Sequence, residues 1–199
     1  MKLAVTVIGP AALGLVLLVG CSTNVREAAP GESATAPAEE ARNVVRSMAR
    51  DTLSDLYASQ PAAKQAVENA AGHAVFSNFG MKILVAGGGT GKGVAVNNKT
   101  GKEVFMRMAE VQAGIGFGVK KFRQVWVFQD QAAFEKFVNS GFEFGGQATL
   151  AAKASGEGLD LAGAVSVSPG VWLYQLTDEG LAAELTVKGT KYYPDTELN

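Results

Sequence analysis

The sequence predicts an α+β fold, with two N-terminal helices packed on a strongly coiled, glycine-rich antiparallel β-sheet or barrel with one short inserted helix. Apolar residues recur every three to four positions over residues 41–57 and at every second position after His73. Glycine is abundant, at 24 of 199 residues, and it alternates along two stretches of the β region. Alternating glycines leave one face of a strand without side chains, which allows sharp coiling or close packing.

The first twenty residues have the layout of a secretory signal, with Lys2 ahead of an apolar run over 3–19. Residues 18–21, Leu-Val-Gly-Cys, resemble the bacterial lipoprotein cleavage box, and Cys21 is the only cysteine. We therefore predict a lipoprotein signal peptide over 1–20 and a lipid anchor on Cys21. An uncleaved membrane anchor with an incidental cysteine is the alternative.

The lipidated cysteine and a flexible linker are predicted over 21–40. This stretch is rich in Ala, Pro, Ser, Glu and Gly, so it cannot bury an apolar face. As a coil it would span roughly 25 Å. By resemblance to lipoproteins, the absence of aspartate at Ser22 favours the outer membrane, facing the periplasm. A single folded domain is then expected over 41–199.

A helix is predicted from Ala41 to Tyr57. Its apolar stripe consists of Ala41, Val44, Val45, Met48, Ala49, Leu53 and Leu56. A neighbouring row of three arginines, at 42, 46 and 50, could contact lipid phosphates. The alternative that the sequence favours is a solvated face, partly paired with Asp51 and Asp55. A second helix is expected to begin at Pro61 and to end at Gly72.

After His73 the pattern predicts an antiparallel meander. Residues 125–128 are apolar on both faces and indicate a central strand. Asp130 is a good N-cap for a short helix that ends at Gly141. The apolar residues of that helix are Phe134, Phe137 and Val138. Further strands are expected around 144–154, 161–167, 171–176 and 181–187.

The glycines at 87, 89, 91 and 93 share one parity, as do those at 114, 116 and 118. We interpret both runs as strand faces without side chains that allow close packing in a coiled sheet, rather than as phosphate-binding loops. A Walker loop needs glycine, four residues, and then Gly-Lys followed by Ser or Thr. Around Gly91-Lys92 the first position is Ala86 and the last is Gly93, so the motif fails. The G-x-G-x-x-G fingerprint also has no match there.

No catalytic or metal-binding constellation stands out. His73 is the only histidine and is expected to cap or pack rather than to act as a base. With Cys21 lipidated, no Cys or His cluster is left for zinc. The acidic pairs Asp178-Glu179 and Glu157/Asp160 fall in turn signals. We therefore predict a protein without catalytic residues, cofactor or metal, and keep an unrecognised enzyme as the weakest hypothesis.

The charge distribution is asymmetric. Residues 82–123 carry eight basic and two acidic side chains, a net charge of +6, whereas residues 124–199 have a net charge of −6. A basic half on a membrane-tethered domain predicts contact with anionic lipid head groups. The candidate head-group residues are Lys82, Lys92, Lys120, Lys121 and Arg123. The alternative is that these lysines lie in turns and edge strands and deter sheet aggregation. Nucleic acid is not expected as a partner.

A series of short motifs follows after about Ala70. They are Gly72-His73-Ala74-Val75-Phe76, the glycines of 87–93 with Val94, Gly114-Ile115-Gly116-Phe117-Gly118, 125–128, Phe134-Glu135-Lys136-Phe137, Phe144-Gly145-Gly146-Gln147-Ala148, Glu179-Gly180-Leu181 and Lys188-Gly189-Thr190. In their order, these motifs resemble those of the SYLF domain family. The resemblance implies binding to phosphoinositides or other anionic lipids, with no catalytic activity. Ser77 departs from the family pattern, in which proline is common, and no binding residue carries over.

Two functional hypotheses follow from these observations. The first is a membrane-anchored envelope lipoprotein whose domain binds phosphoinositide-like or other anionic lipid non-catalytically. The second is a structural or protein-binding envelope module without lipid specificity, for which the sequence indicates no particular protein partner.

Overall fold

The computed structural model describes residues 32–83, 86–113, 118–144, 163–177, 180–181 and 189–199. It has the predicted α+β architecture, with helices first and a sheet after them. The elements are α1 (Glu32–Ser59), α2 (Ala62–Asn69), β1 (Gly72–Ile83), β2 (Ala86–Asn97), β3 (Glu103–Ala113), β4 (Gly118–Phe128), α3 (Gln131–Ser140), β5 (Phe142–Phe144), β6 (Val165–Ser168), β7 (Val171–Thr177), β8 (Gly180–Leu181) and β9 (Thr190–Pro194).

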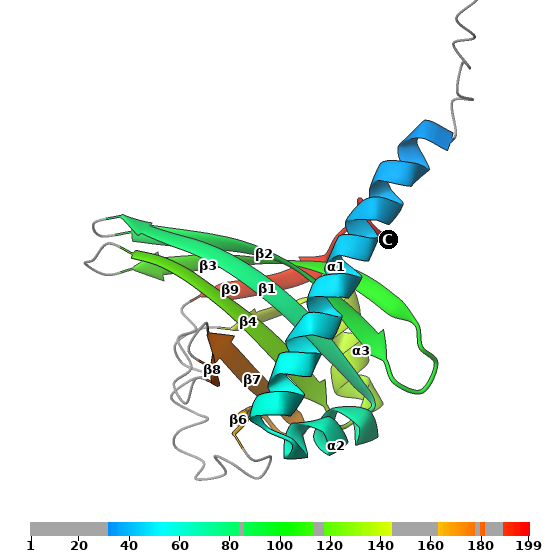
Figure 1. Ribbon diagram of the computed structural model, residues 1–199, viewed down its shortest axis with the longest axis vertical. Helices are drawn as coiled ribbons and strands as arrows, with labels where there is room; N and C mark the ends of the chain where they lie inside the picture. The colour runs from blue at the N-terminus through cyan, green and yellow to red at the C-terminus, as the bar shows by residue number, and fades with distance from the viewer. Residues whose placement is uncertain (1–31, 84–85, 114–117, 145–162, 178–179, 182–188) are drawn as a thin grey trace, which may run out of the picture.

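The strands form one strongly curled antiparallel sheet, a half-barrel, in the order β5-β9-β3-β2-β1-β4-β7-β6, with β8 paired to β7. Figure 1 shows α1 lying diagonally across one face of the sheet and α3 on the opposite face. The ends of β1, β2, β3 and β4 that lie away from the β2–β3 turn extend beyond α1 (Figure 1). The sheet separates two apolar cores, one on each face.

In the core on the α1 side, side chains of α1 and α2 pack against every second residue of the neighbouring strands. Leu56 and Val67 pack there with Val75 and Val125, all of them 2% exposed or less. The core on the α3 side is aromatic. In it the ring of Trp126 lies 5.1 Å from that of Tyr192, measured between centroids. Because strand side chains alternate between faces, β4 contributes to both cores, which confirms the predicted central strand over 125–128.

The alternating glycines of β2 confirm the packing interpretation. Gly93 pairs with Phe76 and Gly91 with Asn78 in the register of β1 and β2. A Cβ atom at Gly93 would collide with the Phe76 ring, and one at Gly91 would collide with the side chain of Met108. These glycines are therefore required by the close approach of large core side chains. The second glycine run is described only at Gly118, the first residue of β4.

The first helix differs from its prediction in two respects. It begins at Glu32 rather than at Ala41, so the predicted flexible linker is helical in its last part. Alanine and glutamate are strong helix formers, and this preference outweighs the low hydrophobicity that indicated a coil. Val44 is 65% exposed instead of lying in the apolar stripe, whereas Thr52 is fully buried. The second helix ends at Asn69, and Ala70 is already extended.

The inserted helix α3 is confirmed with both of its end signals. The Asp130 carboxylate accepts a hydrogen bond from the Ala133 backbone N–H at 2.7 Å, as an N-cap does. Gly141 ends the helix with a φ of 71°, a conformation that favours glycine. The buried residues of the helix are Phe134, Phe137 and Val138.

The C-terminal strands were predicted less well. β7 matches the strand expected at 171–176, but β6 begins only at Val165. Most of the strands expected at 144–154 and 181–187 lies outside the described residues. The strand β9 was not predicted from the sequence. It pairs with β3 and β5, and along it buried Tyr192 is followed by exposed Tyr193. It is short and carries Lys191 and Pro194, so its hydrophobic pattern is weak.

Within the described part of the chain, no helix has the length and apolar character needed to cross a bilayer.

Candidate functional site

Three basic side chains of the predicted head-group site are described in full, and the sheet register relates them. Ser77 on β1 pairs with Lys92 on β2 and with Arg123 on β4. Since neighbouring strands lie about 4.8 Å apart, Lys92 and Arg123 are separated by about 10 Å across this row. Lys121 is two residues from Arg123 on β4 and therefore lies on the same face. Lys92, Lys121 and Arg123 thus share the face of the sheet that carries α1.

The remaining two candidate positions do not share that parity. Lys82 pairs with Gly118, and Lys120 pairs with Gly80. Lys82 is five residues from Ser77 on β1, and Lys120 is next to Lys121 on β4. Because strand positions alternate between faces, both positions belong to the opposite face of the sheet. The five predicted residues therefore do not form one same-face row. Alternation along β4 already separates Lys120 from Lys121 and Arg123, whereas the relation of Lys82 and Lys92 to β4 depends on the register. The side chains of Lys82 and Lys120 lie outside the described part.

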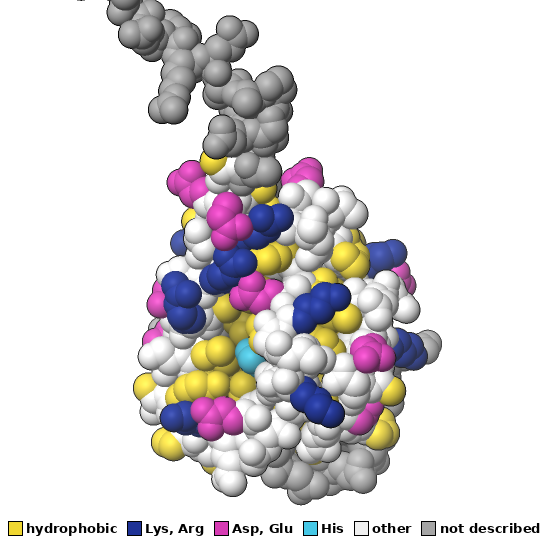
Figure 2. All heavy atoms as spheres, turned by 90° about the vertical axis from the view of Figure 1, so that its right-hand side faces the viewer, with side chains coloured by type: hydrophobic (Ala, Val, Ile, Leu, Met, Phe, Trp, Pro, Cys, Tyr) yellow, Lys and Arg dark blue, Asp and Glu magenta, His cyan; other side chains and the backbone are white. Residues whose placement is uncertain are grey.

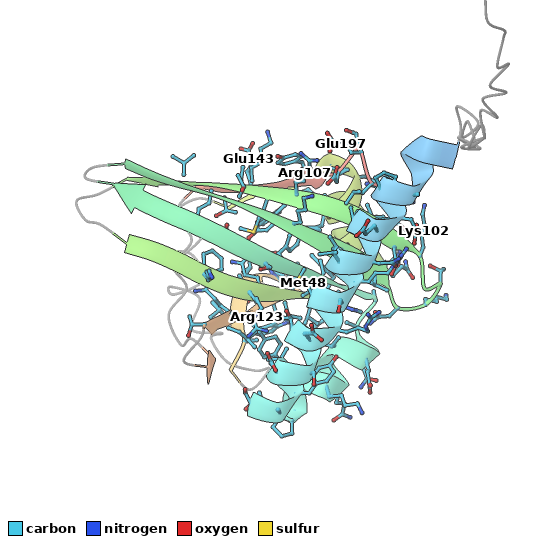
Figure 3. All side chains as sticks on the ribbon, turned by 45° about the horizontal axis from the view of Figure 1, so that its top comes forward. Met48, Lys102, Arg107, Arg123, Glu143 and Glu197 are labelled. Atoms are coloured by element: carbon cyan, nitrogen blue, oxygen red, sulfur yellow. The ribbon has the colours of Figure 1, made fainter. Side chains whose placement is uncertain are left out.

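The arginines of this region are neutralised by internal carboxylates. Arg123 donates through Nη1 to Asp55 Oδ2 on α1 at 2.6 Å. Arg107, the register partner of Lys92, donates through Nε to Asp195 Oδ2 at 2.8 Å and through Nη2 to Glu197. Hydrogen bonding to Asp195 raises the pKa of Arg107. In Figure 3, Arg107 and Glu197 lie side by side above the sheet.

The lysines of the same face are not neutralised in this way. Lys92 and Lys121 are both exposed, and neither forms an ion pair with an acidic side chain among the residues described. They flank Arg123, whose charge is taken up by Asp55. The cationic potential of this face is therefore carried by two exposed lysines rather than by the arginines.

A second polar region is a cleft of about 650 Å³ between the first half of α1, the start of β3 and the C-terminal segment. It is lined by Glu39, Arg42, Arg46, Lys102, Glu103, Val104, Phe105, Val138, Asn139, Pro194, Leu198 and Asn199. Figure 2 shows the side of the molecule that carries the β2–β3 turn, with basic and acidic side chains close together and hydrophobic side chains visible between them.

An ionic network crosses this cleft. The Glu39 carboxylate accepts hydrogen bonds from Arg46 Nη1 at 2.7 Å and from Arg42 Nη1 at 3.0 Å. Arg46 also donates through Nε to Glu103 Oε2 on β3 at 2.9 Å. The hydrogen bond from Arg46, followed by that from Arg42, lowers the pKa of Glu39. Hydrogen bonds to Glu39 and then to Glu103 raise the pKa of Arg46.

The arginine row of α1 was recognised in the sequence, but its partners were not. Asp51 and Asp55 were expected to pair with this row. Instead Asp55 pairs with Arg123, and the arginines at 42 and 46 pair with Glu39 and Glu103. Glu103 is 57 residues from Arg46, so local spacing carried no signal for that contact.

His73 has the structural role that was expected of it. Its Nδ1 lies 2.7 Å from Asn98 Oδ1, and Asn98 Nδ2 donates to the carbonyls of Val67 and Ala70 at 2.6 and 3.0 Å. Because Asn98 uses its amide group as a donor to the end of α2, His73 Nδ1 is the donor to Oδ1. Burial lowers the pKa of His73. The described part of the chain holds no group of three or more His, Cys, Asp or Glu side chains able to bind a metal ion.

Comparison with known proteins matches residues 109–199 to the family model described as "Ysc84: Las17-binding protein actin regulator". The chain is also similar to "Beta cell expansion factor A" of Aeromonas veronii, with 34% identity over 161 residues. That alignment covers 81% of this chain and 60% of the relative, so the chain spans about three fifths of that protein's length. Residues 109–199 thus match the Ysc84, or SYLF, family, in agreement with the resemblance noted in the sequence.

Proposed function

We propose that this chain is a membrane-anchored envelope lipoprotein whose domain binds anionic lipid head groups without catalysing a reaction. The family that residues 109–199 match is one of lipid- or actin-related binding modules, which supports this proposal. The observation that carries the proposal is the pair Lys92 and Lys121. Both lysines are exposed on the α1 face of the sheet, and no described acidic side chain neutralises either of them.

The expected strength of this contact is modest. A basic residue near an anionic bilayer surface contributes about 1 kcal/mol, so two lysines supply only about 2 kcal/mol. Such a contact needs a tether that keeps the domain near the membrane. An acylated Cys21 would supply that tether, since binding of an anchored domain proceeds at a high effective concentration. The anchor would carry several acyl chains, palmitate-like in chemistry, and would hold the protein in the outer membrane facing the periplasm.

Vesicle flotation of the chain beginning at Ser22 tests head-group binding apart from the anchor. We expect flotation with vesicles that contain phosphatidylglycerol and little flotation with neutral phosphatidylcholine vesicles. Because the contact is electrostatic, it should weaken as salt is raised from 0.05 to about 0.5 M. Equal flotation with both kinds of vesicle would refute the proposal.

A charge-matched pair of variants locates the contact. The double variant Lys92→Glu/Lys121→Glu should lose flotation. Lys99→Glu/Lys136→Glu changes the net charge equally but places the charges in the β2–β3 turn and on α3, and it should float like the unsubstituted chain. If both variants lose flotation to the same extent, net charge rather than this face is responsible. Adding Lys120→Glu to the first variant tests the lysine whose side chain is not described.

The second candidate function is a structural or protein-binding module without lipid specificity. It is favoured by the internal neutralisation of Arg107 and Arg123, and by two exposed hydrophobic side chains, Val44 at 65% and Val111 at 69%. Under this alternative, Lys92→Glu/Lys121→Glu would leave the protein's membrane association unchanged. Substituting Val44 or Val111 by Ser would then weaken capture of a protein partner in membrane-free extracts.

A further inference from the structure

The cleft between α1, β3 and the C-terminal segment lies apart from the lysines of the proposed head-group site. Lys92 is four strand positions from Val96, the register partner of Glu103, which corresponds to about 13 Å along β2. In Figure 3, Lys102 lies beside the N-terminal half of α1, whereas Arg123 lies on the other side of the helix. The cleft is thus a separate region with its own basic side chains.

Three donor groups in the cleft lack an acceptor among the described residues. Arg42 uses Nε for the Leu198 carbonyl and Nη1 for Glu39. Arg46 uses Nε for Glu103 and Nη1 for Glu39 and Asn43. This leaves Nη2 of each arginine. The third donor is the ammonium group of Lys102, which is exposed in the β2–β3 turn and forms no described ion pair.

The two guanidinium groups are held in place before any ligand arrives. Arg46 lies over the Phe105 ring, with 5.2 Å between its Cζ atom and the ring centroid, and donates to the Glu103 carboxylate, which the proposed ligand does not displace. Arg42 is fixed by its 2.7 Å hydrogen bond to the Leu198 carbonyl. A ligand that binds to positioned side chains loses less conformational entropy, so pre-organisation favours binding.

Three apolar side chains also line the cleft. They are Phe105, Val138 and Leu198, which are 4%, 6% and 6% exposed. Basic side chains next to apolar ones suit a ligand that combines an anionic group with a small apolar substituent. The volume of about 650 Å³ lies within the usual range for small-molecule sites.

We propose that this cleft binds a small organic phosphate, with the phosphate on Arg42, Arg46 and Lys102 and an apolar substituent on Phe105, Val138 and Leu198. Guanidinium groups match phosphate oxygens with paired N–H donors, and an ammonium group adds a compact charge. Three cations face the two carboxylates of Glu39 and Glu103, so the side chains that line the cleft have a net positive charge. The phosphate can belong to a free metabolite or to a lipid head group.

Glu39 has a specific part in this proposal. Its carboxylate now accepts hydrogen bonds from both arginines, and its side chain is 49% exposed. A ligand phosphate would compete with the Glu39 carboxylate for the N–H donors of Arg42 and Arg46. Binding of a phosphate would therefore displace Glu39 toward solvent, and removal of its charge would favour the ligand.

The test is isothermal titration of the full chain in a neutral detergent with three probes. Hexyl phosphate combines both chemical features, inorganic phosphate has only the anion, and hexanol has only the apolar group. We expect hexyl phosphate to bind roughly tenfold or more tightly than inorganic phosphate, and hexanol to give no measurable binding. Failure of hexyl phosphate to bind, or equal binding of hexanol, would overturn the proposal.

Matched variants place the site. Lys102→Gln should weaken hexyl phosphate binding roughly tenfold through loss of a charge-assisted hydrogen bond. Lys99→Gln, in the same turn but outside the cleft, should leave the affinity unchanged, and Glu39→Gln should raise it. Equal effects of the two lysine variants, or lower affinity in Glu39→Gln, would contradict the assignment.

Competition with vesicles distinguishes the two sources of phosphate. Displacement of hexyl phosphate by vesicles containing phosphatidic acid, but not by neutral vesicles, assigns the site to a lipid head group. No displacement by either assigns it to a free organic phosphate, and both results support the cleft as a phosphate site. Lys92→Glu/Lys121→Glu should leave hexyl phosphate binding intact, so failure of the head-group proposal and failure of this one are told apart.

Discussion

The hydroxyl group of Tyr192 on β9 donates a 2.6 Å hydrogen bond to Gln124 Oε1 on β4, and both side chains are 1% exposed or less. These strands are not neighbours in the sheet, so the bond crosses the interior of the half-barrel on the α3 side. Burial, with the nearby Glu110 carboxylate, raises the pKa of Tyr192 far above its usual range. The phenol therefore remains a hydrogen-bond donor even in alkaline solution.

Tyr192→Phe should destabilise the protein by about 1–3 kcal/mol, because it leaves the buried Gln124 carbonyl oxygen without its donor. The measurement is urea denaturation followed by circular dichroism. Tyr193→Phe, at the adjacent exposed position, is the matched control and should change the free energy of unfolding by less than about 0.5 kcal/mol. Equal effects at the two positions would show that the buried bond does not contribute to stability.

Gly93→Ala should cost about 1–3 kcal/mol of stability, because its Cβ would collide with the Phe76 ring and with the Val75 carbonyl group. Gly88→Ala, in the same strand, is the control. Its Cβ would come no closer than 3.4 Å to the Glu110 carbonyl oxygen. Thermal denaturation of the two variants compares them directly. A Gly93→Ala protein as stable as Gly88→Ala would refute the packing role of this glycine.

Asp130→Ala should destabilise the protein by about 1 kcal/mol, since it removes the 2.7 Å N-cap bond to Ala133 at the start of α3. Asp130→Asn keeps an oxygen acceptor at the same place and should restore most of the loss. Denaturant unfolding of both variants provides the measurement. If Asn and Ala at this position were equally destabilising, the effect would come from charge rather than from capping.

The buried His73 predicts a fall in stability as the solution becomes acidic. Its folded-state pKa lies below the ordinary value of about 6.5, so the unfolded chain binds the proton more readily. Its contribution is therefore fully present above about pH 6.5. It decreases as the pH falls from there towards the folded-state pKa.

Unfolding free energies between pH 7.5 and 5.5 test this expectation, with His73→Gln as the comparison. The variant has no titrating group at this position and should lose the part of the pH slope that His73 causes. Parallel slopes for the two proteins would contradict the prediction. Rising stability of the unsubstituted protein on acidification would also contradict its sign.

Cys21→Ser should remove the predicted lipid anchor. When the gene is expressed in a Gram-negative host, the unsubstituted protein should be recovered in the membrane fraction and should incorporate labelled palmitate. The Cys21→Ser variant should incorporate none. The mass of the mature amino terminus gives an independent measurement, because acylation and cleavage before Cys21 change it together. Palmitate incorporation into the Cys21→Ser protein would exclude Cys21 as the acylated residue.

Local features of the fold were predictable because their physical causes act over a few residues. Asp130 sets the start of α3 by accepting a hydrogen bond from the Ala133 backbone N–H on its side chain, and Gly141 sets the end through its positive φ value. The glycine parity of β2 follows from side-chain alternation in a strand. The start of α1 was missed because low hydrophobicity over 32–40 was read as flexibility, although alanine and glutamate favour a helix.

The candidate sites were predictable only in part. The local excess of basic residues indicated Lys92 and Lys121, and alternation along β4 separates Lys121 from Lys120. Only the register of β1, β2 and β4 places Lys92 on the face of Lys121 and Lys82 on the other. Asp55, which neutralises Arg123, is 68 positions from it in the sequence, so local spacing could not predict this ion pair. The same applies to Arg46 and Glu103, which together form part of the cleft.

By itself the sequence determined the fold class, the glycine-lined strand and the capped helix, since hydrogen bonding and side-chain periodicity between near neighbours decide these features. Only the tertiary structure decided which residues far apart in the sequence come into contact. The pairing of β9 with β3 buries Tyr192 and brings Asp195 to Arg107, and the crossing of α1 over the sheet brings Arg46 to Glu103. Such contacts depend on strand order and on the curl of the whole sheet, which arise from the packing of both cores at once.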